Sequence, residues 1–224
     1  MTLSTVFAAL AGILAVSQIL PYTLSSIKGN TKPSPIASGI SLTSNAVIAI
    51  TMFLAGARAG MVLPIGFVFT GTITFYLAIK YGRVTFAKSD IINAGIAVAA
   101  IGSWLLLGPR VALVAMALAN LTSVSAVFRK LLRHPGTEDS LSWVMVFVAT
   151  CCSIIAILLE GAYDPAVLFV PIVGLVAFGS VAGLTLFQQR SARTIAVETA
   201  SPTWATMPAP ATALPAANDL VLVS

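Results

Sequence analysis

Charged residues are scarce in this chain of 224 amino acids. Twelve lysines and arginines and seven aspartates and glutamates make up 8% of the sequence, against about 25% in a typical soluble domain. Hydrophobic residues make up 58%. So few charges could not cover the surface of a soluble fold, and the composition therefore excludes a soluble enzyme, a disordered chain and a nucleic-acid binder.

Cysteine and histidine are nearly absent as well. The two cysteines, Cys151 and Cys152, are neighbours in an apolar run, and their diverging side chains cannot form an ordinary disulfide. We interpret them as small hydrophobic residues. The single histidine, His134, lies in a basic loop. Because no metal-ligand spacing, phosphate-binding loop or Ser-His-Asp set is present, the sequence predicts no metal, no cofactor and no enzymatic activity.

Long apolar segments are what the chain does contain. A helix needs about 20 apolar residues to cross a bilayer, and seven segments approach or reach this length. The first has no basic residue before it, so we expect it to span the bilayer and not to be cleaved as a signal peptide. The sequence thus predicts an all-α integral membrane protein with seven transmembrane helices. The segments are Leu3–Tyr22, Ile36–Gly56, Gly60–Ile79, Ile91–Leu107, Val111–Phe128, Leu141–Leu159 and Ala166–Phe187.

The basic residues support this number of helices. If the segments alternate in direction, ten of the twelve basic residues fall on one side, which the positive-inside rule assigns to the cytoplasm. The N-terminus is then outside a cell membrane, inner or plasma, and the C-terminus is cytoplasmic. Beyond Arg193, alanine and proline predict a disordered tail over residues 191–224. The ten residues are Lys28, Lys32, Lys80, Arg83, Lys88, Arg129, Lys130, Arg133, Arg190 and Arg193.

A weak repeat with a spacing of 106 to 107 residues relates the two ends of the chain. It aligns Thr31 with Thr137 and Ser34 with Ser140, and later Pro64 with Pro171. Three segments would precede one linker segment and three would follow it, so both triplets have the same orientation in the membrane. We predict two parallel three-helix repeats, residues 1–82 and 111–190, joined by a linker helix at 83–110.

This 3+1+3 arrangement resembles the SWEET sugar transporters and the broader PQ-loop family. The resemblance covers about residues 3–190. It rests on Pro21 late in the first segment, on the basic loop that ends Thr31-Lys32-Pro33-Ser34, and on glycines and tyrosines around the third segment, namely Gly66, Gly71, Tyr76 and Tyr81. It implies transport of a small neutral solute such as a sugar by alternating access between the repeats. The second repeat carries Val127 where Pro21 would recur.

Polar residues inside the segments are the candidates for solute contact. Asp, Glu, Lys and Arg, which mark proton relays and ion pumps, do not occur there, so a passive facilitator is predicted. Pro21 is read either as a hinge or as the end of the first helix. The same polar residues could instead bond helices to one another, as in a non-transporting scaffold or assembly protein. The predicted partners are the lipid bilayer and a small solute, with a homo-oligomer left open. The candidate contacts are Gln18, Ser41, Asn45, Thr74, Asn120 and Thr150.

Overall fold

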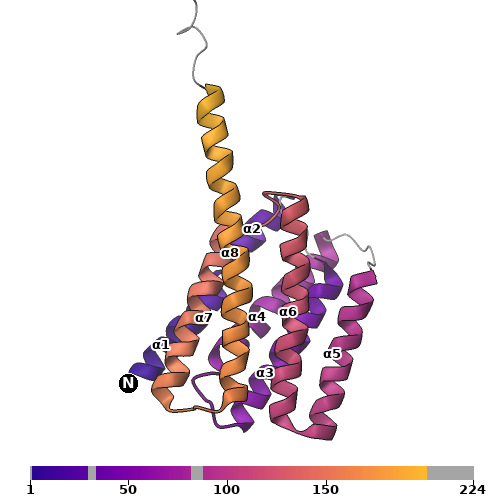
Figure 1. The fold of residues 1–224 in the computed structure, drawn as a ribbon, viewed down its shortest axis with the longest axis vertical. Coiled ribbons are helices and arrows are strands. Elements are labelled where there is room, and N and C mark those ends of the chain that lie inside the picture. The colour runs from indigo at the N-terminus through magenta and orange to yellow at the C-terminus, as the bar shows by residue number, and fades with distance from the viewer. Residues whose placement is uncertain (1, 30–33, 82–87, 201–224) are drawn as a thin grey trace, which may run out of the picture. The chain divides into compact units, whose positions relative to one another are not determined.

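The computed structural model describes residues 2–29, 34–81 and 88–200, in which every regular element is an α-helix (Figure 1). Six candidate membrane spans occur in this part, one of them formed by α1 and α2 together. Each of the seven predicted segments coincides with a helix or with that pair, but α5, at the fourth predicted segment Ile91–Leu107, is not among the six candidate spans. The helices are α1 (Leu3–Ser17), α2 (Ile19–Ile27), α3 (Pro35–Leu54), α4 (Val62–Tyr81), α5 (Lys88–Leu107), α6 (Pro109–Arg133), α7 (Ser140–Glu160) and α8 (Pro165–Ala200).

The first apolar segment is interrupted at Gln18, between α1 and α2. Pro21 explains the interruption, because proline has no N–H to donate to the carbonyl of Ser17 and its ring crowds that carbonyl. The helix resumes and continues to Ile27, past the predicted end at Tyr22. It stops where Gly29 adopts a φ of +76°, a conformation that favours glycine.

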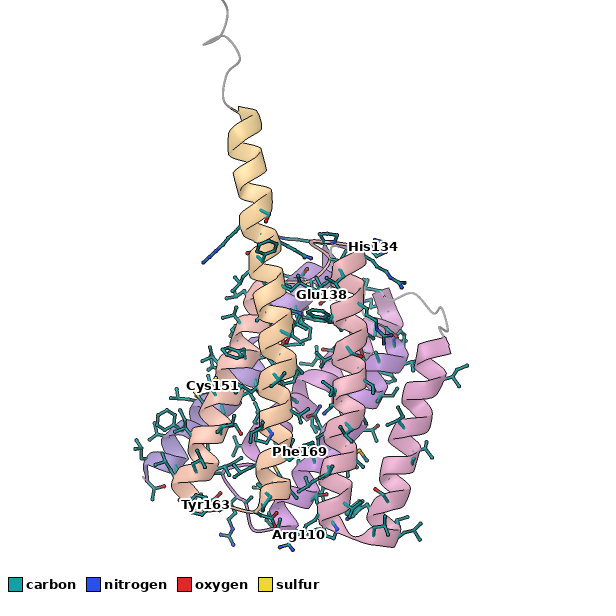
Figure 2. All side chains as sticks on the ribbon, in the orientation of Figure 1. Arg110, His134, Glu138, Cys151, Tyr163 and Phe169 are labelled. Carbon is teal, nitrogen blue, oxygen red and sulfur yellow. The ribbon has the colours of Figure 1, made fainter. Side chains whose placement is uncertain are left out.

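The helix bundle has two ends with different charge. The basic end carries Lys28, Lys80, Lys130 and Arg133, where α2, α4 and α6 finish. Figure 2 shows His134 and Glu138 at this end, with Arg110 and Tyr163 at the opposite end. The opposite end also carries Arg58, Glu160 and Asp164, in or beside the short connections that follow α3 and α7.

Residues Met1–Gln189 form one compact unit, in which most helices pack on neighbours distant in sequence. Helix α4 contacts both α1 and α3, α1 packs against α7, and α3 packs against α6. Helix α5 lies beside α6 (Figure 1) and also touches α3. Helix α8 meets α6 through Gln188, whose Nε2 donates to the carbonyl of Leu131 at 3.0 Å.

Small side chains let α1 approach its neighbours closely. Ala8, Ala11 and Ala15 are all buried, and the hydroxyl of Ser4 donates to the carbonyl of Ala156 on α7 at 2.9 Å. Small residues and such hydrogen bonds hold helices together in a bilayer, where lipid tails are as apolar as leucine and give little hydrophobic drive to associate.

Larger apolar side chains fill the bundle toward the opposite end. Ile48 and Met52 of α3 meet Leu113 and Met116 of α6 in one cluster, together with Ile157 of α7. All five are at most 1% exposed. Toward the opposite end, the interior of the bundle is therefore filled by apolar side chains.

Residues Arg190–Ser224 form the second unit. Helix α8 continues through Ala200, into the stretch that the composition predicts to be disordered. The first proline of that stretch is Pro202, so no residue before it forces the helix to end. The remainder of the predicted tail, 201–224, lies outside the described residues.

Candidate functional site

A cavity of about 300 Å³ lies between α2, α3, α4, α6, α7 and α8 and reaches the basic end. This volume is at the lower end of the range for small-molecule sites. The lining combines hydroxyl and amide groups with aromatic rings. Besides the residues predicted from the sequence, it includes the hydroxyls of Ser38, Thr70 and Ser123.

The structure brings five of the six predicted contact residues together in this cavity. They come from four places in the chain: the break between α1 and α2, then α3, α4 and α6. Pro21 lines neither this cavity nor the smaller one described below. The five residues in the cavity are Gln18, Ser41, Asn45, Thr74 and Asn120.

Thr150 is the predicted contact that lies apart from the other five. It lines a second cavity of about 40 Å³ farther from the basic end, with room for only a few water molecules. Its side chain is fully buried, and its hydroxyl donates to the carbonyl of Val146 in its own helix at 2.8 Å. This hydroxyl is already satisfied, so Thr150 has little to offer a solute.

Several polar groups in the larger cavity keep unused hydrogen-bonding capacity. The side chains of Asn120, Gln18 and Thr74 make no hydrogen bond within the described part of the chain. Asn45 donates from Nδ2 to the carbonyl of Ser41 at 2.8 Å, and this leaves its Oδ1 as an acceptor. A polar group in an apolar setting costs free energy until it finds a partner, so this cavity presents hydrogen-bonding groups that a partner could satisfy.

Two phenylalanine rings stand where the two cavities meet. Phe67 of α4 and Phe178 of α8 line both cavities, and their ring centroids lie 5.9 Å apart in an edge-to-face arrangement. Asn45 and Asn120 border both cavities as well. Amides and aromatic rings from four helices therefore surround the junction.

The opposite end is closed by contacts between the first and last thirds of the chain. Oε2 of Glu160, at the end of α7, accepts a hydrogen bond of 2.9 Å from the backbone N–H of Ala59 in the α3–α4 turn. Next to it, a Cβ placed on Gly60 would stand only 3.0 Å from the side chain of Ile157. The larger cavity thus reaches the basic end, while contacts between α7 and the α3–α4 turn join the helices at the opposite end.

An ion pair at the mouth of the cavity has no counterpart in the sequence-based prediction. Nζ of Lys130 lies 2.8 Å from Oε1 of Glu138, whose side chain is only 5% exposed. The indole Nε1 of Trp143 donates to Oε2 of the same carboxylate at 3.3 Å. In the sequence, Lys130 and Glu138 belong to a basic loop between two apolar segments. The feature that could have identified them is a single glutamate that follows several basic residues just before an apolar helix.

Replacing Glu138 by glutamine is expected to lower the free energy of unfolding by about 1–3 kcal/mol. The amide still accepts from Trp143, but the ammonium of Lys130, which is 32% exposed, loses its counter-charge. The cost stays below that of a fully buried pair because Lys130 can turn toward water. Thermal unfolding in detergent micelles measures the difference.

The matched control for Glu138→Gln is Arg110→Gln at the opposite end. Arg110 pairs with Asp164 at 2.9 Å, but its side chain is 80% exposed, and exposed pairs contribute about 0–1 kcal/mol. Equal loss of stability in both variants would contradict a special role for the Lys130–Glu138 pair.

The described side chains were also compared with the requirements of a metal site. Among the described residues, no group of three or more His, Cys, Asp or Glu side chains is arranged to hold a metal ion. Comparison of the chain with protein-family models, with curated proteins and with solved structures found no match.

Proposed function

We propose that this chain is a membrane transporter, a facilitator that moves a small neutral solute such as a sugar. The solute would bind in the cavity of about 300 Å³ and reach one side of the membrane at a time, by alternating access between two three-helix repeats. No cofactor and no chemical step is part of this proposal.

One observation carries the proposal: hydrogen-bonding groups left unpaired in an apolar bundle converge on a single cavity. Asn120, Gln18 and Thr74 come from separate helices or helix ends, yet all three line the same space. A scaffold that used these residues to bond helices together would pair them across helix interfaces. The side chain of Asn45 bonds only within its own helix, to Ser41.

The helix contacts support the proposed 3+1+3 arrangement. In the first triplet α1, α3 and α4, the third helix α4 packs on both α1 and α3. The most extensive contacts between the triplets are α1 with α7 and α3 with α6, and α2 and α4 also touch α7. Exchanging the two triplets, so that α1 becomes α6 and α3 becomes α7, converts one of these contacts into the other. This is the pattern that a two-fold axis along the membrane normal would produce.

The charges support an orientation with the basic end in the cytoplasm. The N-terminus then lies outside the cell. In this orientation the cavity opens inward, and the packed cluster around Met52 and Met116 closes it to the outside. Alternating access would require a second conformation in which this cluster separates and the basic end closes.

Uptake by proteoliposomes tests the proposal. The full chain is reconstituted, and entry of labelled neutral solutes (a monosaccharide, a disaccharide, a polyol and a neutral amino acid) is measured with no ion gradient. At least one solute is expected to enter saturably, faster than into protein-free liposomes, until the two sides are equal. An imposed proton or sodium gradient is expected to leave the final level unchanged.

A charged analogue of the transported solute, of the same size, serves as the control. The charged residues described in the cavity, Lys130 and Glu138, already pair with each other. They therefore leave no counter-charge for a charged solute, and the analogue is expected to be excluded. Absence of flux for every solute in the panel would overturn the transport proposal. Flux that appears only with an ion gradient would overturn the facilitator mechanism.

A further inference from the structure

The two triplets of helices differ at the basic end. In the first triplet, the helix is interrupted at one residue, Gln18, which keeps helical angles (φ −60°, ψ −18°), and α2 continues for nine residues beyond it. In the second triplet, α6 runs without interruption from Pro109 to Arg133. Val127 stands in α6 at the position 106 residues after Pro21, and valine donates the backbone hydrogen bond that proline lacks.

The break at Gln18 has little backbone bonding to hold it straight. Position 21 offers no N–H to Ser17, and the next bond, from the N–H of Tyr22 to the carbonyl of Gln18, is long at 3.4 Å. The hydroxyl of Ser142 on α7 lies 3.2 Å from the same carbonyl. The break is thus anchored to α7 at the point where the chain can bend.

The basic end of the second triplet is braced by side chains. Besides the ion pair of Lys130 with Glu138, Gln188 of α8 spans two neighbours. Its Nε2 donates to the carbonyl of Leu131 at 3.0 Å, and its Oε1 accepts from the N–H of Gly136 at 3.4 Å. These contacts tie the end of α6, the α6–α7 connection and α8 into one wall.

Helix α2 borders the mouth of the cavity, where it packs on α4 and meets α7 of this wall. Gln18 at its start and Tyr22 on its first turn line the cavity. Only Ile19 and Ser26 of α2 are buried, and Leu24 is 58% exposed. The hydroxyl of Tyr22 makes no hydrogen bond among the described residues, so a movement of α2 breaks no bond of this group.

We propose that the gate at the basic end is one-sided. Helix α2 swings about the break at Gln18 to close the mouth, while the basic ends of α6, α7 and α8 stay together as a fixed wall. The inference rests on the proposed transport function for its purpose. Its physical content is a difference in mobility between two parts of the basic end, and this can be measured without any solute.

Distances between pairs of spin labels test the one-sided gate. The full chain, with Cys151→Ala and Cys152→Ala, is labelled at exposed positions and studied in lipid nanodiscs by electron paramagnetic resonance. One pair joins α2 to the wall (Leu24→Cys with Leu132→Cys), and the other lies within the wall (Phe187→Cys with Leu132→Cys). The α2 pair is expected to give two distance populations and the wall pair one.

Two further substitutions sharpen the outcome. Pro21→Ala restores the missing backbone donor and is expected to remove the second population of the α2 pair, and to slow hydrogen exchange in α2 about tenfold. Val127→Ala is the matched control and leaves both pairs unchanged. Gln188→Ala releases the brace and broadens the wall pair only.

Three results would overturn the one-sided gate. They are an α2 pair as narrow as the wall pair, equally broad distributions for both pairs, and an α2 pair that Pro21→Ala does not alter. Because the distances are measured without solute, failure of transport in the uptake panel leaves this test intact. If the protein transports a solute while α2 stays fixed, the proposed function stands and the one-sided gate is wrong.

Discussion

The double substitution Asn45→Ala with Asn120→Ala is expected to reduce solute flux about 10- to 100-fold. Both asparagines border the junction between the two cavities, through which the proposed function routes the solute. Each hydrogen bond lost to the solute costs about 0.5–1.5 kcal/mol, and about 1.4 kcal/mol corresponds to a factor of ten. The effect is measured as initial uptake by proteoliposomes at equal protein content.

The control for the asparagine pair is Thr43→Ala with Thr72→Ala. These threonines are exposed on α3 and α4, and their hydroxyls donate within their own helices, to the carbonyls of Gly39 and Val68. Flux in this variant is expected to equal that of the unmodified chain. If the two double variants lose flux equally, the junction is not the solute path; if neither loses flux, the asparagines do not contact the solute.

The helices could be predicted from the sequence because a bilayer imposes a strong and local requirement. Apolar length and the position of basic residues need no knowledge of tertiary contacts, and each predicted segment coincides with a helix. The ends of the helices were harder to predict, because hydrophobicity indicates which residues lie in the membrane and not where the helix ends. Helix α2 continues to Ile27, shortly before Gly29 with its positive φ, and α8 is helical through Ala200.

The composition of the site was predictable in part, by the same reasoning. Polar residues inside apolar helices are costly, and that cost singled out Gln18, Asn45 and Asn120 before their neighbours were known. Lys130 and Glu138 were not predicted, because charged residues near the end of an apolar segment resemble ordinary loop residues. Phe67 and Phe178 were not predicted, because nothing in the sequence distinguishes them from phenylalanines that face lipid.

The closeness of α1 and α4 is the feature with the second large expected effect. Replacing Gly66 by alanine is expected to lower the free energy of unfolding by about 1–3 kcal/mol. The added Cβ would stand 2.8 Å from the Cβ of Ala15 and 3.5 Å from the carbonyl oxygen of Gly12. Ala15 is fully buried and has no rotatable side chain, so the helices themselves must move apart.

Thermal unfolding of the chain in detergent micelles measures this effect, with Gly183→Ala as the control. A Cβ on Gly183 meets nothing within 4 Å, so that variant is expected to be unchanged or more stable by up to about 1 kcal/mol, since alanine favours helix. Adding Ala15→Gly to Gly66→Ala is expected to restore stability, because the pair then exchanges which helix carries the methyl group. Equal behaviour of the two glycine variants, or no rescue, would mean that α1 and α4 do not meet at these residues. Rescue would show that this approach, on which the positions of Gln18 and Thr74 in the cavity depend, is set by the volume of one methyl group.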